Sequence, residues 1–212
     1  MVDQMHSSVV ARASLDFGPI RIEYDETVIE PRPWTVRQSQ WAADAARDLA
    51  DGPILELCSG AGQIGLAAAV LSGRDLVQID ASPEACRLAR LNADAAGHGR
   101  RVEVRNAPIA GALRETERFP LVLADPPYIP SDLVEDFDDP RHSIDGGHDG
   151  LGFLVDCCAL AARHLVPGGI LSVQLWGAHQ AAQLRTRLPR SLAGVELRSF
   201  AHDRAIWHLT RV

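Results

Sequence analysis

The most informative stretch of this chain is Ile54-Leu55-Glu56-Leu57-Cys58-Ser59-Gly60-Ala61-Gly62-Gln63-Ile64-Gly65. Its residues 54–57 predict a short apolar strand, and residues 63–71 predict a helix. Between them, Gly60 and Gly62 allow the backbone to turn sharply and to approach a ligand closely. A strand that enters a helix through a glycine-rich turn is typical of proteins with a parallel α/β sheet.

Strand and helix patterns alternate on both sides of this unit. Helices are predicted at residues 35–51, 83–96, 151–165 and 178–188. Further strands are predicted at residues 76–79, 102–104, 121–124, 170–175, 195–201 and 206–210, the last two as an antiparallel hairpin. The alternation predicts an α/β fold, with a doubly wound, mostly parallel sheet of seven strands. Ligands of such sheets bind at the carboxyl ends of the strands.

The rest of the chain adds smaller predictions. Residues 15–24 alternate apolar and polar side chains around Gly18-Pro19, which predicts a short hairpin. We expect one domain over residues 1–212, in which residues 1–34 form this hairpin and a lid-like extension. Trp176 and Trp207 fall in strand patterns, so we expect both in the core.

Composition limits the class of function. The chain has 212 residues and a formal net charge of −7, and all 21 of its basic residues are Arg. A lysine-based catalyst is therefore excluded, and the negative charge weighs against a broad electrostatic grip on nucleic acid. No apolar run reaches the roughly 18 residues of a membrane span, and the N-terminus lacks the pattern of a signal peptide.

The cysteines show no spacing of a zinc site or of a disulfide framework. They are Cys58, Cys86, Cys157 and Cys158. We therefore expect no metal site, buried thiols, and a location in the reducing cytoplasm.

Two acidic residues near the glycine-rich turn point to a class of cofactor. The carboxylate of Glu56, just before the glycines, would repel a pyrophosphate and attract an ammonium group. Asp80 ends the second predicted strand, 18 residues beyond Gly62, where an acid can accept both hydrogens of a ribose diol. These features favour S-adenosylmethionine over NAD.

The fourth predicted parallel strand runs directly into Asp125-Pro126-Pro127-Tyr128. Two prolines after a strand fix a rigid, extended turn. The Asp125 carboxylate and the Pro126 carbonyl can each accept one N–H of an amino group, which turns the nitrogen lone pair toward a methyl donor. Tyr128 can pack on the plane of an amide or base. The tetrapeptide is thus suited to orient a nitrogen for methylation.

These residues resemble the class I S-adenosylmethionine-dependent methyltransferases, with their Rossmann-like fold, and more narrowly the release-factor glutamine N5-methyltransferase family. The resemblance runs from about Val28 to the C-terminus. It is supported by Ile29-Glu30-Pro31-Arg32-Pro33-Trp34-Thr35, Asp145-Gly146-Gly147-His148-Asp149-Gly150-Leu151, Val166-Pro167-Gly168-Gly169-Ile170 and His202-Asp203-Arg204. It implies catalytic roles for Asp125, Pro126, Pro127 and Tyr128, and cofactor contacts from Glu56, Cys58, Ser59, Gly60, Gly62, Asp80, Ala81, Ile109 and Asp125.

The chain departs from this family at several positions. Asp125 stands where the family usually has Asn, and Asp is more usual in relatives that methylate exocyclic nitrogens of nucleic-acid bases. Trp34 stands where an acid is expected. Ala107-Pro108-Ile109 replaces the acid near the adenine, so we expect backbone groups and Ile109 to hold that ring. The 212 residues show no counterpart of the family's N-terminal helical domain, so we expect a protein similar to the short forms, which are expected to need a small partner protein.

An acidic segment follows the tetrapeptide. Residues 132–139 contain Asp132, Glu135, Asp136, Asp138 and Asp139, with no Arg between Arg118 and Arg141. If it borders the site, this segment repels a phosphate backbone and favours a cationic peptide or amine.

The leading hypothesis is an S-adenosylmethionine-dependent N-methyltransferase that acts on a protein glutamine amide, as in a translation release factor. Two alternatives are N-methylation of a small amine metabolite and N-methylation of an exocyclic nitrogen of a nucleic-acid base, although nucleic acid is disfavoured by charge. A third is a non-catalytic cofactor-binding partner of a second subunit. A nucleotide-dependent oxidoreductase fits less well because Glu56 faces the place of a pyrophosphate.

Overall fold

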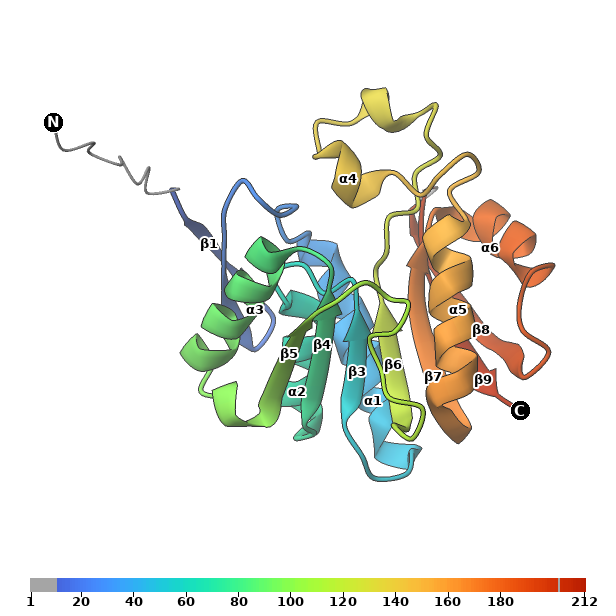
Figure 1. The fold of residues 1–212 in the computed structure, drawn as a ribbon, viewed down its shortest axis with the longest axis horizontal. Helices are drawn as coiled ribbons and strands as arrows, with labels where there is room; N and C mark the ends of the chain where they lie inside the picture. Colours follow the sequence, from blue (N-terminus) through green and yellow to red (C-terminus); the bar gives the residue numbers. More distant parts are fainter. Residues whose placement is uncertain (1–10, 202) are drawn as a thin grey trace, which may run out of the picture.

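The computed structural model describes residues 11–201 and 203–212 (Figure 1). Its main sheet has seven strands in the order β5-β4-β3-β6-β7-β9-β8. The strands are β3 (Ile54–Leu57), β4 (Leu76–Asp80), β5 (Val102–Asn106), β6 (Phe119–Ala124), β7 (Leu165–Leu175), β8 (Leu192–Ala201) and β9 (Arg204–Arg211). Strands β3 to β7 pair in parallel, whereas β9 is antiparallel to both of its neighbours. The predicted sheet and its C-terminal hairpin are thus confirmed.

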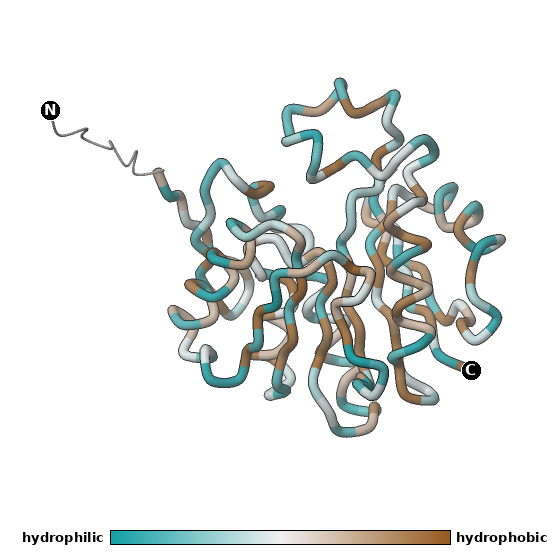
Figure 2. The backbone as a smooth tube through the Cα atoms, in the orientation of Figure 1, coloured by the Kyte–Doolittle hydropathy of each residue, from teal (hydrophilic) through white to brown (hydrophobic). Residues whose placement is uncertain are grey.

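Helices cover both faces of this sheet. One face packs on α1 (Val36–Ala45), α2 (Gln63–Ser72) and α3 (Pro83–Ala95), and the other on α5 (Gly152–His164) and α6 (Gly177–Arg185). The central strands are largely apolar along their length (Figure 2), because each face of the sheet is covered. Leu55 and Leu57 pack toward α5, while the alternate residue Ile54 packs toward α1 and α2.

A separate hairpin closes the first face. It consists of β1 (Ala13–Phe17) and β2 (Ile20–Tyr24), joined through Gly18 at φ 59°, as predicted. The buried amide of Asn92 on α3 holds it in place. Asn92 Oδ1 accepts from the Glu23 N–H at 2.8 Å, and Asn92 Nδ2 donates to the carbonyls of Glu23 and Ala61, each at 2.9 Å. The same side chain therefore joins the hairpin to the glycine-rich turn.

Some elements differ from the sequence-based expectation. Strand β7 begins at Leu165 rather than at residue 170, although its regular pairing with β6 does resume at Ile170, beyond an irregular stretch at Pro167. Helix α6 ends at Arg185 rather than at residue 188, because the residue before Pro189 is disfavoured in a helix. The helix predicted at residues 35–51 ends as α1 at Ala45 and continues only as the 3-10 turn η2 (Ala46–Asp48). The short helix α4 (Arg141–Ile144) and three further 3-10 turns of the described chain were not predicted. These turns are η1 (Pro33–Thr35), η3 (Gly99–Arg101) and η4 (Val134–Asp136).

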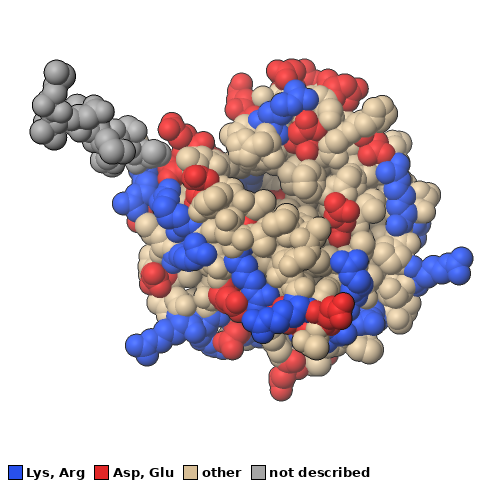
Figure 3. All heavy atoms as spheres, viewed as in Figure 1, with Lys and Arg blue, Asp and Glu red and all other residues tan. Residues whose placement is uncertain are grey.

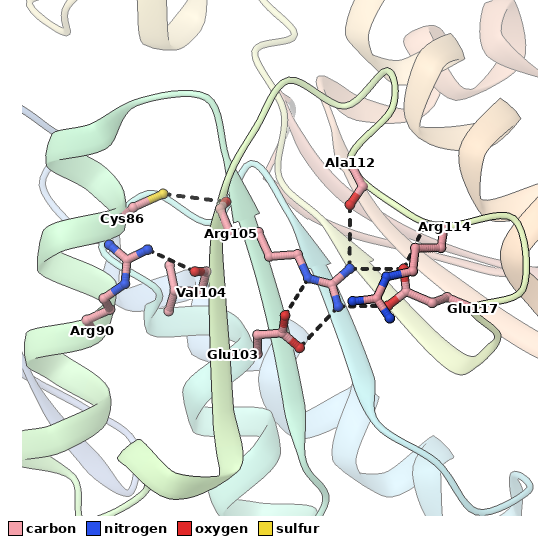
Figure 4. Close-up of polar contacts among 8 residues, drawn as sticks. All are labelled: Cys86, Arg90, Glu103, Val104, Arg105, Ala112, Arg114 and Glu117. Carbon is pink, nitrogen blue, oxygen red and sulfur yellow. Dashed lines mark hydrogen bonds and ion pairs between the residues drawn. The ribbon is translucent and has the colours of Figure 1, made fainter.

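Arg105 on β5 fixes the connection that leads to β6 (Figure 4). Its guanidinium donates to Glu103 at 2.9 and 3.1 Å and to Glu117 at 2.7 and 3.1 Å. These bonds lower the pKa of both carboxyl groups. The connection between Asn106 and Glu117, which carries Ile109, is therefore anchored at both of its ends.

Two expectations fall partly outside the described residues. The lid-like extension was assigned to residues 1–34, of which residues 1–10 are not described, and its role as a lid stays a prediction. His202 of the expected Asp-Arg turn is likewise outside the described residues. Among the helices of the described chain, none is long and apolar enough to cross a membrane.

Replacing the Asn92 amide should loosen the hairpin and the turn together. Asn92→Ala leaves one buried N–H and two carbonyls without their partner, so we expect the free energy of unfolding to fall by about 2–4 kcal/mol. Urea denaturation measures this change. Asp94→Ala, at an exposed position of the same helix, is the control and should stay within about 0.5 kcal/mol. A loss below about 1 kcal/mol at Asn92 would contradict the anchoring role.

Candidate active site

The predicted site residues lie at or after the carboxyl ends of β3, β4, β5 and β6, which parallel pairing brings to one edge of the sheet. In the order of these strands across the sheet, Asp80 ends β4, the glycine-rich turn follows β3, and Asp125 follows β6. This edge is the one at which open α/β sheets bind ligands.

The turn after β3 depends on an unusual backbone. Cys58, Gly60 and Gly62 adopt φ values of 56°, 53° and 83°. A Cβ on Gly62 would lie 2.6 Å from Gln78 Nε2, so the turn packs too tightly for a side chain there. A Cβ on Gly60 would meet no protein atom within 4 Å, so this glycine faces open space where a ligand can approach the backbone.

Glu56 lies behind this turn, and both of its carboxylate oxygens are already engaged. Oε1 accepts from the Gly65 N–H at 2.8 Å, and Oε2 accepts from Gln78 Nε2 at 2.7 Å. The side chain is 3% exposed, and this burial raises the pKa of Glu56 to about 8. Glu56 thus shapes the turn directly, and the attraction of an ammonium group stays a prediction.

Asp80 joins the ends of two strands. Asp80 Oδ2 accepts from the Gly60 N–H at 2.8 Å, and Oδ1 accepts from the Ser82 N–H at 2.9 Å. Asn106, at the end of β5, donates to the backbone carbonyls of Asp80 and Ala81. The sequence analysis missed Asn106, although its position at a strand end was a usable indication.

The remaining predicted cofactor residues surround this turn. Cys58 is half-buried, Ala81 is exposed, and Ile109 packs at the margin of the core under α5. Ser59 is buried, and its Oγ finds no hydrogen-bond partner among the described residues. An unpaired hydroxyl beside the open space at Gly60 fits a site that takes a polar ligand.

The tetrapeptide lines a cavity of about 250 Å³. Asp125, Pro126, Pro127 and Tyr128 all contribute to its wall. Burial raises the pKa of Asp125 to about 7, an effect that the Arg204 guanidinium partly offsets. Within the described chain, no side chain or backbone group holds the Asp125 carboxylate, so both of its oxygens remain available.

The segment after α4 fixes the far end of the tetrapeptide. A Cβ on Gly146 would lie 2.8 Å from the Cα of Tyr128, so only glycine allows this approach. The Ile129 carbonyl accepts from the Gly146 N–H at 2.8 Å, and the Tyr128 carbonyl accepts from Gln180 Nε2 at 2.9 Å. Ser131 in turn donates to Asp145 at 2.6 Å. These contacts give a packing role to residues 145–151.

The acidic segment lies over the cavity and is partly neutralised. Figure 3 shows acidic side chains gathered at the top of the molecule, where Figure 1 places α4. Asp139 pairs with Arg32 at 2.6 Å, and Arg141 pairs with Glu135 at 2.7 Å. No ion pair is present for Asp132, Asp136 or Asp138 within the described residues.

The structure also brings residues to the cavity that the sequence analysis did not place there. Trp34, Gln174 and Trp176 line it, as does Arg204. The expectation that Trp176 lies in the core was wrong: it follows the last residue of β7 and is only half-buried at the cavity wall. Trp207 is 1% exposed, as predicted. A strand pattern does not show where a strand ends, and the position of Trp176 depends on that end.

A second cavity, of about 520 Å³, lies at the opposite edge of the sheet. It is lined by Arg47, Arg74 and Arg101 together with acidic and apolar residues. The Arg74 guanidinium is already bonded to four backbone carbonyls after α1. None of the predicted site residues reaches this cavity, so it is separate from the candidate site.

A model of the family described as "Conserved hypothetical protein 95" matches residues 26–139, and the chain falls within that family. A release factor glutamine methyltransferase of Mycolicibacterium smegmatis is 36% identical over 166 residues, which are 74% of this chain and 57% of that protein. That of Caulobacter vibrioides is 30% identical over 203 residues, which are 90% of this chain and 68% of that protein. The chain belongs to the release factor glutamine methyltransferase family.

This member of the release factor glutamine methyltransferase family spans only 57% of the length of its relatives from Mycolicibacterium smegmatis and Gloeobacter violaceus. Solved structures agree on the fold. A methyltransferase from Pyrococcus furiosus aligns with a TM-score of 0.67 at 18% identity, over 90% of this chain and 88% of its own. TrmN from Thermus thermophilus aligns with a TM-score of 0.63 at 20% identity, over 87% of this chain and 55% of its own. The expected Rossmann-like class I methyltransferase fold is confirmed.

Burial of Glu56 should make stability depend on pH. Its pKa of about 8 lies above the ordinary 4.5, so the folded chain binds the proton more tightly, and this stabilisation is lost as pH rises through about 8. Glu56→Gln removes the titrating group. We therefore expect the free energy of unfolding to fall between pH 5 and 8 more steeply in the wild type than in the variant. The two decreases should differ by on the order of 3 kcal/mol.

Urea denaturation across this pH range measures the effect. Glu103→Gln is the control, because the pKa of Glu103 is lowered and the group titrates below the range. Parallel pH curves for the wild type and Glu56→Gln would show that Glu56 is ionised at all of these pH values.

Proposed function

We propose that this chain is an S-adenosylmethionine-dependent N-methyltransferase whose substrate is a protein glutamine amide, as the names of its relatives indicate. The observation that carries the proposal is the position of Asp125. Asp125 directly follows β6 and lines a cavity of about 250 Å³, and its carboxylate has no hydrogen-bond partner among the described residues. Because Leu57 pairs with Ala124, Asp125 lies beside Cys58, the first residue of the turn. A nitrogen in this cavity would therefore be held beside a cofactor on the turn.

The residues around the turn fit S-adenosylmethionine. The open space at Gly60 supports an approach of the ribose and amino-acid portions to its backbone, and the Asp80 carboxylate, which accepts from the Gly60 N–H, is proposed to accept from the ribose diol as well. The unpaired Ser59 hydroxyl and the half-buried Cys58 border the same space. Ile109 is proposed to contact the adenine. When bound, the cofactor supplies an electrophilic methyl group.

The residues of the chain orient the acceptor. The Asp125 carboxylate and the Pro126 carbonyl accept the two hydrogens of the amide nitrogen, which directs the lone pair toward the methyl group. Pro126 and Pro127 hold this geometry because they cannot pair with a neighbouring strand. Tyr128 packs on the plane of the amide and excludes water. The Asp125 carboxylate can take up the proton that the nitrogen gives up.

The surface around the cavity favours a protein substrate. Asp132, Asp136 and Asp138 give the rim a negative field, which attracts a basic protein surface and repels phosphate. We propose a translation release factor as the substrate, in line with the relatives. The free thiols of the chain suit a reducing cytoplasm. A small activating partner protein stays a prediction.

Asp125→Ala tests the assignment. One lost acceptor should lower methyl transfer on the order of 10²-fold or more, while binding of S-adenosylhomocysteine stays within a few fold. Radiolabelled transfer into a host lysate, split by protease, nuclease and a small-pore filter, measures the loss and identifies the substrate class. Asp51→Ala, at the opposite edge of the sheet, is the control. Unchanged transfer in Asp125→Ala would refute the role, and label removed by nuclease would refute the protein substrate.

The pKa of Asp125 predicts the pH dependence of transfer. Only the ionised carboxylate accepts with both oxygens, and burial raises the pKa of this group to about 7. We expect kcat/KM to rise with pH through about 7 and then to level off. Asp125→Asn keeps an acceptor oxygen and cannot ionise. Its kcat/KM should therefore be lower and should no longer rise with pH through about 7. If kcat/KM of the variant still rises through the same pH, another group is responsible for the titration.

A further inference from the structure

The cavity beside Asp125 is lined by two residues with an unpaired polar side-chain atom. Trp34 Nε1, a donor, and Gln174 Oε1, an acceptor, are buried and find no hydrogen-bond partner among the described residues. An unpaired buried polar atom destabilises the fold, because it has lost its water without gaining a hydrogen bond. One of these two atoms is a donor and the other an acceptor, and both belong to residues of one cavity. They indicate a ligand that accepts from the first and donates to the second.

Gln174 is held so that its oxygen is the free end. The residue is 1% exposed, and its Nε2 donates to Gln38 Oε1 at 2.6 Å. Gln38 is itself fixed, because its Nε2 donates to the carbonyls of Ser172 and Ala124 at 3.0 and 3.3 Å. The orientation of the Gln174 amide is therefore set by α1 and by the ends of β6 and β7.

Register places Gln174 next to Asp125. Ala124 on β6 pairs with Val173 on β7, so the residues that follow them lie side by side. Both turn away from the face occupied by Ala124 and Val173, because side chains alternate along a strand. The cavity thus has two side-chain acceptors at one end, Asp125 and Gln174.

Trp34 forms another part of the wall, and neighbouring side chains hold its ring. The Arg204 guanidinium carbon lies 5.4 Å from the ring centroid, and the Phe200 ring lies 6.1 Å away at an angle of 40°. These contacts engage the apolar surface of the indole and leave its N–H without a partner.

We propose that Trp34 and Gln174 select a primary carboxamide: Trp34 Nε1–H donates to the carbonyl oxygen, and Gln174 Oε1 shares with the neighbouring Asp125 carboxylate the one N–H that Asp125 accepts, while the other N–H donates to the Pro126 carbonyl. The inference rests on the proposed function and names the residues that recognise the substrate by hydrogen bonds. An alkyl amine has no oxygen to offer and leaves the Trp34 N–H unpaired. Sites built to hydrogen-bond a substrate group strongly disfavour analogues that lack it.

A spectroscopic experiment tests Trp34 without turnover. The full ¹⁵N-labelled chain, with S-adenosylhomocysteine present, is titrated with acetyl-glutamine methylamide or with acetyl-ornithine methylamide, which has a methylene in place of the carbonyl. Trp34→Phe identifies the Trp34 indole signal among those of the four tryptophans. We expect only the glutamine compound to shift the Trp34 indole proton downfield. An unmoved signal, or equal shifts with both compounds, would overturn the proposal.

Methyl transfer to two peptides that differ only in glutamine or ornithine separates the two residues. Trp34→Phe keeps an aromatic ring and removes the donor, so kcat/KM for the glutamine peptide should fall about tenfold while the ornithine rate is unchanged. Gln174→Met should lower the rates with both peptides, because both present N–H. Trp41→Phe, whose ring stacks on His208 at 3.3 Å outside the cavity lining, is the control for Trp34.

An equal loss with both peptides in Trp34→Phe would overturn the proposal. Failure of the proposed function has a different outcome: the wild type would then transfer no methyl group to glutamine, although the Trp34 indole signal still responds to the carboxamide.

Discussion

The buried carboxylate of Glu56 is the interaction on which the ligand-binding edge depends. Its two oxygens hold the Gly65 N–H and the Gln78 amide, and Gln78 Nε2 also donates to the Gly62 carbonyl at 3.0 Å. These bonds fix the start of α2 and the end of the turn relative to β4. The turn then meets Asp80 at Gly60, so one buried acid sets the position of the backbone that is open to a ligand.

The acceptor cavity depends on a different set of contacts, which are distant in sequence. Residues 145–151 pack against Tyr128 and Ile129 from one side, and the ion pair between Arg32 and Asp139 joins the chain before α1 to the acidic segment. Parallel pairing of β3, β6 and β7 brings these parts to the same edge as the turn. The proposed positions of the cofactor and of the acceptor are thus adjacent because of strand order. The residues that surround each position come from separate segments of the chain.

Much of the fold followed from local patterns. Apolar strands buried on both faces, glycines at tight turns and the Ser82 cap are properties of short segments, and they predicted the sheet with its two hairpins. Patterns failed where structure depends on contacts outside the segment. Strand β7 extends past Pro167 toward Leu165, and α4 is too short to show a helical period. Trp176 was misplaced because the pattern does not show which residue leaves the sheet.

The amino-acid sequence alone determined the fold class, the family and the residues at the carboxyl ends of the strands, because these depend on residue types at fixed local spacing. The tertiary structure decided how those residues are used. It showed that both oxygens of Glu56 serve the turn, that the Asp125 carboxylate has no hydrogen-bond partner among the described residues, and that burial raises the pKa of both groups. It also placed Trp34 and Gln174 at one cavity, a relation between η1 and β7 that only the packing of distant segments can create.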